Sequence, residues 1–138
     1  MLSIGEISRR TDVKVPTIRY YEQIGLMPDP GRTDGNQRRY GDDAVERLNF
    51  IRHSRDLGFS VDAIRELIEL GEHPGRPCER ADTIAATQLR EVRARIARLQ
   101  SLERELERML AACSGRHDIG GCRVYAALAD HALCSDDH

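Results

Sequence analysis

The fold of this chain is decided by one stretch, Pro16-Thr17-Ile18-Arg19-Tyr20-Tyr21-Glu22-Gln23-Ile24-Gly25. Proline suits the first position of a helix, where its missing N–H costs nothing, and glycine suits the position just after a helix. Upstream, Ser3 and Glu6 match a capping box for another short helix that ends near Arg10. Two short helices joined by a tight turn predict a helix-turn-helix, whose second helix, 16–24, would enter the DNA major groove.

A hairpin is expected to follow the second helix. Pro28 and Pro30 break the chain, and residues 32–40 centre on the turn sequence Asp34-Gly35-Asn36. Such a sequence is typical of a β-hairpin turn. We interpret residues 32–40 as the wing of a winged helix-turn-helix.

Two further helices complete the predicted head, which covers residues 1–71. The third is expected to begin at a cap formed by Asp42 or Asp43 and to end near Gly58, and the fourth to begin at Ser60 and end before Gly71. Helical spacing of apolar residues predicts the positions that face inward: Val45, Leu48, Ile51, Ile64, Leu67 and Ile68.

Side chains that could contact DNA gather in the second helix and the wing. Arginine offers a planar set of donors for phosphates and base edges, and a tyrosine hydroxyl can bind phosphate while its ring packs locally. The predicted DNA-binding residues are Thr17, Arg19, Tyr20, Tyr21, Arg38 and Arg39. One of the two tyrosines is expected to be mainly a core residue, and the sequence leaves open which one.

Composition narrows the class of protein. Aromatic residues make up 4% of the 138 residues and charged residues 32%, which suits long solvated helices rather than one large core. The net charge of −2 does not by itself indicate a nucleic-acid partner. The sequence contains neither an apolar run long enough to span a membrane nor a secretory signal, so we expect a cytoplasmic protein without membrane contact. Its cysteines are then expected to bind metal or to react, rather than to form disulfides.

A long helix is predicted over residues 79–112, which contain no proline or glycine. Its apolar residues recur at heptad-like spacing, and we name them the apolar stripe: Leu89, Val92, Ile96, Leu99, Leu102, Leu106 and Met109. A chain this short offers little for a seam of about 50 Å to pack against. The pattern therefore favours a homodimer through this helix, although an amphipathic helix packed on its own chain would show the same pattern.

Cysteines stand at both ends of this helix. Cys78 precedes it after the linker 72–78, and Cys113 and Cys122 bound a glycine-rich loop that follows it. A helix about 50 Å long separates the ends within one chain. If two long helices pair antiparallel, Cys78 of one chain lies beside Cys113 and Cys122 of the other. Soft thiolates then predict a site for Zn, Cd, Pb, Hg or Cu(I) rather than Mg or Ca.

Histidines and a fourth cysteine add candidates whose roles stay open. His117 lies in the loop. One interpretation makes it the fourth ligand of a zinc ion, which prefers four N or S ligands, and the other makes it an exposed loop residue. His131, Cys134 and His138 could form a second site, or could belong to a tail without metal. Residues 124–133 are expected to form a short final helix that covers the loop, within a last segment of 113–138.

Several of these motifs together resemble the MerR family of transcriptional regulators. The resemblance rests on Ile4-Gly5-Glu6-Ile7, on Thr17-Ile18-Arg19-Tyr20-Tyr21-Glu22 ahead of Gly25-Leu26, and on Gly35-Asn36-Gln37-Arg38-Arg39-Tyr40. It continues through residues 47–52 and 57–59. It implies the antiparallel dimer and a wing arginine on the DNA backbone, which favours Arg38.

The resemblance is to the divalent-metal-responsive branch. Family members that sense divalent ions carry cysteine at the position of Cys78, whereas sensors of monovalent ions carry serine, so Cys78 implies a divalent effector. A histidine four residues after Cys113, as His117 is here, resembles a ligand of zinc-responsive members. The effector implied is Zn(II), with Cd(II) or Pb(II) as alternatives.

The family also implies a mechanism. A homodimer binds a palindromic operator in double-stranded promoter DNA with an over-long spacer, and the metal-bound form bends and untwists that DNA so that RNA polymerase can read both promoter elements. Genes for metal export or sequestration are the implied targets.

Two alternatives belong to other classes. A redox regulator of the same family would use Cys113 and Cys122 as a disulfide or cluster site, but the close four-cysteine spacing of cluster-bearing members is absent. A cysteine enzyme would need a base and an orienting group at one thiol, and only His117 is near. We therefore predict a regulator and no enzyme. The expected fold is mainly α: a winged helix-turn-helix, a long antiparallel coiled-coil dimerisation helix, and a metal-binding loop with a short helix.

Overall fold

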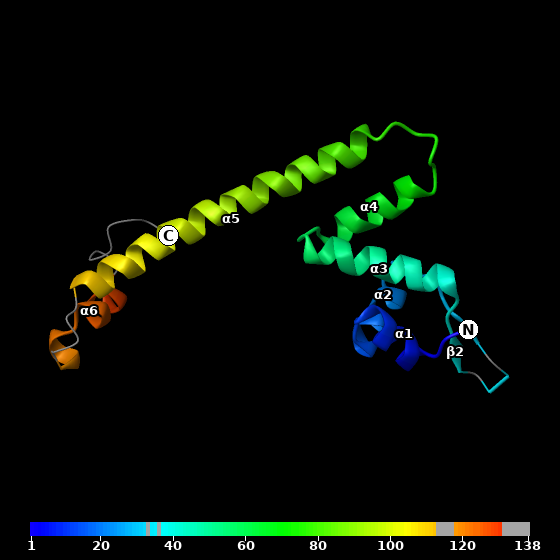
Figure 1. Ribbon diagram of the computed structural model, residues 1–138, viewed down its shortest axis with the longest axis horizontal. Coiled ribbons are helices and arrows are strands. Elements are labelled where there is room, and N and C mark those ends of the chain that lie inside the picture. Colours follow the sequence, from blue (N-terminus) through cyan, green and yellow to red (C-terminus); the bar gives the residue numbers. More distant parts are fainter. Residues whose placement is uncertain (33, 36, 113–117, 131–138) are drawn as a thin grey trace. The chain divides into compact units, whose positions relative to one another are not determined.

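The computed structural model of the chain is mainly helical and describes residues 1–32, 34–35, 37–112 and 118–130 (Figure 1). It divides into two compact units, Met1–Ile84 and Ala85–His138. The elements in chain order are α1 (Ile4–Thr11), α2 (Val15–Gln23), β1 (Gly31–Arg32), β2 (Arg38–Arg39), α3 (Asp42–Asp56), α4 (Val61–Gly71), α5 (Glu79–Ala112), η1 (Ile119–Gly121) and α6 (Arg123–Ala129). A winged helix-turn-helix followed by a long helix is thereby confirmed. The pairing of two long helices stays a prediction.

The helix-turn-helix forms where the sequence predicts it. α1 begins at the capping box, in which Glu6 N donates to Ser3 Oγ over 3.2 Å and Ser3 N donates to Glu6 Oε1 over 3.4 Å. α2 begins one residue earlier than expected, so Pro16 takes its second position. That position suits proline equally, because no N–H of the first turn has a partner within the helix. Gly25 follows α2 with a φ of 77°, which favours glycine.

The wing is the predicted hairpin. β1 and β2 pair antiparallel, and their register places Arg32 opposite Arg38. The next residue, Tyr40, forms a bridge with Leu2, in which the two backbones exchange hydrogen bonds of 2.7 and 2.8 Å. The start of the chain is therefore fixed to the base of the wing.

The caps of α3 and α4 differ from each other. Gly41 is the N-cap of α3 and no side chain caps that helix, so the predicted cap by Asp42 or Asp43 is wrong. Both aspartates lie inside the first turn instead, where their negative charges interact favourably with the helix dipole. Ser60 caps α4 as predicted, because its Oγ accepts from Ala63 N over 3.1 Å.

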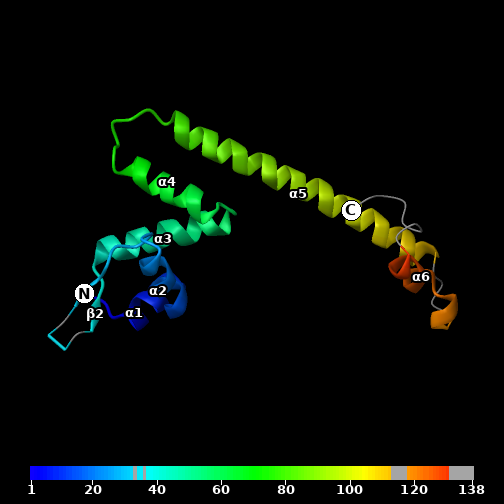
Figure 2. The same cartoon turned by 180° about the vertical axis from the view of Figure 1, so that it is seen from behind.

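One hydrophobic core holds the first unit together. α1 packs on α2 and on α3, and α3 packs on α4, as Figure 2 shows from behind. The predicted inward residues Leu48 and Ile64 are fully buried, whereas Leu67 is half-buried. The core comprises Ile7, Val13, Ile18, Tyr21, Leu26, Met27, Tyr40, Val45, Leu48, Ile51 and Ile64.

The long helix α5 is unbroken over its 34 residues, which are those predicted from the sequence. Much of the apolar stripe lies uncovered within the chain. The exposed fractions are 47% for Leu89, 50% for Ile96, 64% for Leu99 and 57% for Leu106. No helix in the described part of the chain is both long and apolar enough to cross a lipid bilayer.

The short helix α6 lies against the C-terminal end of α5 (Figure 2). It covers less of the chain than the predicted 124–133. Met109 of α5 and Ala127 of α6 are both buried, and they line one hollow of about 430 Å³ with Glu105 and Arg108 among others. Met109, predicted as the end of the apolar stripe, therefore packs within its own chain, because α6 lies on that side of α5.

Candidate functional site

The helix α2 presents two of its predicted contact residues to solvent. Arg19 is exposed and Tyr20 is 50% exposed, whereas Thr17 is half-buried. Tyr21 is only 8% exposed and belongs to the core, with its ring centroid 6.0 Å from that of Tyr20. The question that the sequence left open is thus answered: Tyr21 is the core residue, and Tyr20 is the ring available for contact.

The structure brings α2 and the wing together around a shared concavity, which we name the arginine-lined hollow. It has a volume of about 460 Å³ and is lined by Ser3, Ile4, Gly5, Arg19, Arg32, Gln37 and Arg38. Three guanidinium groups around one concavity suit an anion with several oxygens, such as a phosphate. Two of the arginines, Arg19 and Arg38, are predicted contact residues. Arg32 was missed by the sequence reasoning, although its place opposite Arg38 in the hairpin could have identified it.

A buried carboxylate lies next to this hollow. The side chain of Glu22 is 6% exposed, and its Oε1 accepts a hydrogen bond from the Tyr40 hydroxyl over 3.0 Å. Its Oε2 lies 3.8 Å from Arg38 Nε. Burial, followed by the hydrogen bond to Glu22, raises the pKa of Tyr40 to about 12. The sequence reasoning missed Glu22 as a functional residue, since nothing in its spacing indicates what a carboxylate in α2 would contact.

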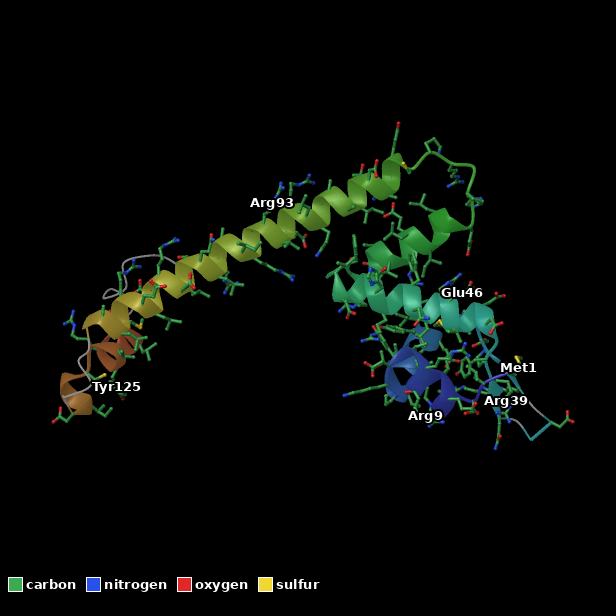
Figure 3. The ribbon with its side chains drawn as sticks, viewed as in Figure 1. Met1, Arg9, Arg39, Glu46, Arg93 and Tyr125 are labelled. Carbon is green, nitrogen blue, oxygen red and sulfur yellow. The ribbon has the colours of Figure 1, made fainter. Side chains whose placement is uncertain are left out.

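Arg39 lies on the wing, as Figure 3 shows, and is half-buried. Its charge acts on the beginning of α1: hydrogen bonding to Ser3 is the main cause that lowers the pKa of Glu6, and attraction by Arg39 and Arg9 contributes less. Arg39 is not among the residues that line the arginine-lined hollow. Of the two wing arginines predicted to contact DNA, Arg38 alone lines that hollow with Arg19.

Cys78 stands immediately before α5 and is exposed as a free thiol. Its Sγ lies 3.9 Å from Asp82 Oδ2, one helical turn further on. The same first turn is joined to α4 by a bidentate ion pair between Arg80 and Glu66, in which Arg80 Nη2 donates to Glu66 Oε2 over 3.0 Å. The hydrogen bond from Arg80 lowers the pKa of Glu66. Cys78 is therefore accessible on a turn that is anchored to the helix-turn-helix unit.

Cys122 carries a second thiol and is partly buried. It lies between η1 and α6, where Asp118 Oδ1 accepts from Gly121 N over 3.1 Å and stabilises the turn before it. Thiols at these two positions are soft donors, which fits a soft divalent ion.

The other predicted ligands lie outside the described residues: Cys113, His117, His131, Cys134 and His138. Among the residues that the structure describes, no three His, Cys, Asp or Glu side chains come together as a metal site. The predicted ligand set, which draws on two chains, therefore stays a prediction.

Two family models match the chain. The model "MerR HTH family regulatory protein" matches residues 2–70, and the model "MerR, DNA binding" matches residues 45–109. The first covers the predicted head, and the second continues through most of α5.

Individual relatives match over nearly the whole length. The HTH-type transcriptional regulator ZntR of Escherichia coli (strain K12) is 42% identical over 96% of this chain and 95% of its own length. The mercuric resistance operon regulatory protein of Serratia marcescens is 37% identical over 92% of this chain and 87% of its own. The crystal structure of the transcription regulator PbrR691 from Ralstonia metallidurans CH34 in complex with lead(II) superposes with a TM-score of 0.78, at 34% identity over 93% of this chain and 99% of the other.

Proposed function

The chain belongs to the MerR family of DNA-binding transcriptional regulators, and on this premise we propose that it is a metal-responsive regulator that acts on promoter DNA as a homodimer. The observation that carries the proposal is the full-length match to metal-linked regulators in a chain with thiols at both ends of α5. One of these relatives is named for mercuric resistance, and another is a lead(II) complex. Those names support the metal class and do not select one metal.

The DNA-binding surface consists of α2 and the wing. Arg19 and Tyr20 are exposed on α2, and Arg38 lines the same hollow as Arg19. Thr17 and Arg39 complete the contact set, with Thr17 near bases at the start of α2. Tyr21 supports this surface from the core.

The dimer forms through the apolar stripe of α5. Four of its seven residues are at least 47% exposed within the chain, and contiguous exposed apolar surface of this kind usually marks an interface. Antiparallel pairing is supported by the cysteines, since it brings Cys78 of one chain beside Cys113 and Cys122 of its partner. Each end of the paired helices then carries one metal site.

The effector is a divalent soft ion, with Zn(II) first and Cd(II) or Pb(II) next. Three thiolates and a divalent ion leave a net charge of about −1 at the site, which Cys78 makes possible. Zinc prefers four ligands, and His117 would supply the fourth. Metal binding favours one packing of loop, final helix and α5, and so changes the angle between the two heads. The promoter DNA is thereby distorted for RNA polymerase, at genes for metal export or resistance.

The test replaces single cysteines and measures metal-induced transcription beside operator affinity. We expect Cys78→Ser, Cys113→Ser and Cys122→Ser each to lose induction, because each removes one of three ligands, while operator binding stays within about twofold because the head is unchanged. Cys134→Ser is the matched control, which we expect to respond like the wild type. Induction that survives all three substitutions would overturn the proposal.

A panel of metals identifies the effector. A promoter reporter would be exposed to Zn(II), Cd(II), Pb(II), Hg(II) and Cu(I), in the wild type and in His117→Ala. Loss of the zinc response alone would assign His117 as a zinc ligand. A reporter that responds to peroxide or diamide under metal chelation, and to none of the metals, would instead support the redox regulator, for which the present relatives offer no support.

A further inference from the structure

The buried carboxylate of Glu22 connects α2 to the wing. Both of its oxygens face residues of the segment 38–40: Oε1 accepts from the Tyr40 hydroxyl at 3.0 Å, and Oε2 lies 3.8 Å from Arg38 Nε. The side chain is 6% exposed, so its charge is removed from water. A buried carboxylate is costly unless charged or hydrogen-bonding groups compensate it. Here Arg38 and Tyr40 supply that compensation.

Arg38 forms an ion pair with this carboxylate, and its N–H groups remain available as hydrogen-bond donors. Its Nε is buried and has no hydrogen-bond partner among the described residues, and 3.8 Å is an ion-pair distance rather than a hydrogen bond. The side chain as a whole is still 29% exposed and lines the arginine-lined hollow with Arg19. Glu22 is not among the lining residues, so the surface presented to an anion is basic.

We propose that Glu22 is a positioning residue for DNA binding, which holds Arg38 beside Arg19 so that both guanidinium groups bind the same phosphate of the operator backbone. The inference rests on the proposed DNA-binding function and deepens it. Arginine retains a wide range of side-chain conformations when free, and restricting them in advance lowers the entropic cost of binding. A two-arginine site also fits the several oxygens of one phosphate.

The first test is Glu22→Gln, which preserves shape and can still accept from the Tyr40 hydroxyl but carries no charge. We expect operator affinity to fall about tenfold and the slope of log K against log salt to become about one unit shallower, because the proposed phosphate site needs both guanidinium groups and is lost when Arg38 moves away from Arg19. We expect Glu22→Gln combined with Arg38→Ala to bind no more weakly than Arg38→Ala alone. A purely structural role would give additive losses and an unchanged slope, and either result would overturn the proposal.

The second test does not depend on a substitution in the core. Arg19→Gln and Arg38→Gln both remove surface charges, and the double variant reports whether they share a phosphate. A shared phosphate predicts a slope shallower by about one, whereas separate phosphates predict about two and would contradict the inference. Arg93→Gln on α5, labelled in Figure 3, is the charge-matched control and should leave the slope unchanged. This pair tests the shared phosphate, whereas Glu22→Gln tests the positioning of Arg38 by Glu22.

Different results would refute the proposed DNA-binding function and the role of Glu22. A wild-type protein that binds no promoter DNA, at any salt concentration, would refute the proposed function itself. A wild type that binds its operator and responds to metal, while Glu22→Gln keeps the full salt slope, would refute the role of Glu22 alone.

Discussion

The two units of this chain bury their apolar residues in different ways. The unit Met1–Ile84 encloses a core of eleven residues drawn from α1, α2, α3, α4 and the connecting segments. The unit Ala85–His138 buries Met109 and Ala127 but leaves Leu89, Ile96 and Leu99 about half or more exposed. The first unit therefore buries its apolar core within one chain, whereas the second presents apolar surface that a second copy can cover.

This difference indicates which buried apolar surface stabilises each unit. Burying apolar surface contributes about 25 cal/mol per Å², so the enclosed core stabilises the first unit without any partner. The exposed residues of the apolar stripe would contribute only in the proposed dimer, whose stability depends on concentration. We propose that the first unit recognises DNA and that the second serves assembly and sensing.

The largest effect should come from the enclosed core. Leu48 is fully buried in α3, and Leu48→Ala should lower the free energy of unfolding by about 3 kcal/mol, because it removes buried methyl groups and leaves a cavity. Urea unfolding followed by circular dichroism measures this. Leu57→Ala is the matched control, since Leu57 is 54% exposed and should change stability by less than about 0.5 kcal/mol. Equal losses in both variants would remove the contrast between enclosed and exposed leucines.

The next effect should appear only in the dissociation constant of the proposed dimer. Leu99 is 64% exposed in the middle of the stripe, and Leu99→Glu would place a carboxylate in each half of the dimer seam. We expect the dimer dissociation constant to rise about 100-fold, equivalent to about 2.7 kcal/mol, because that charge must leave water. Analytical ultracentrifugation over a concentration series measures it.

The control for Leu99→Glu is Ala94→Glu, which adds the same charge on another face of α5. Ala94 is exposed and stands five residues away, so its side chain points well away from the stripe. We expect this variant to dimerise like the wild type. A dimer that tolerates Leu99→Glu, or that fails equally with Ala94→Glu, would mean that the stripe is not the interface.

The smallest effect is a loss of stability at alkaline pH, which we expect from Tyr40 in the first unit and not from Tyr125 in the second. Burial and Glu22 raise the pKa of Tyr40 from about 10 to about 12, so the native state holds that proton more tightly than the unfolded chain does. The resulting stabilisation, about 2.7 kcal/mol, is fully present below pH 10, and about 2.3 kcal/mol of it is lost by pH 12. We expect Tyr40→Phe to lack this alkaline loss in urea unfolding between pH 9 and 12. Tyr125→Phe, which alters a ring 60% exposed on α6, should keep it.

Much of the first unit was predictable because its signals are local. The capping box of Ser3 and Glu6, the cap at Ser60 and the glycine after α2 each act within a few residues, and all three appear as expected. The N-cap of α3 was not predicted correctly, because Gly41 precedes two aspartates that could each cap a helix. Competing local signals at neighbouring positions are resolved only by the path of the chain that leads into the helix.

The sequence predicted which types of residue form the candidate site, but not which of their side chains contact one another. Arg19 and Arg38 stand out in the sequence, and the structure places them around one hollow. Arg32 and Glu22 did not stand out, since their importance comes from the side chains across from them. The choice between Tyr20 and Tyr21 was likewise open, because adjacent helical residues differ by about 100° in direction and only the packing of the core selects which one faces inward.

The sequence by itself determined the elements of this protein: short capped helices, a wing, a long charged helix with an apolar stripe, and thiols at its ends. These follow from backbone preferences and side-chain periodicity, which operate over a few residues. Only the tertiary structure decided that Tyr21 is core, that Met109 packs beneath α6, and that Glu22 joins Arg38 and Tyr40. Those outcomes depend on contacts between segments distant in the sequence, whose free energy arises only after the chain has folded.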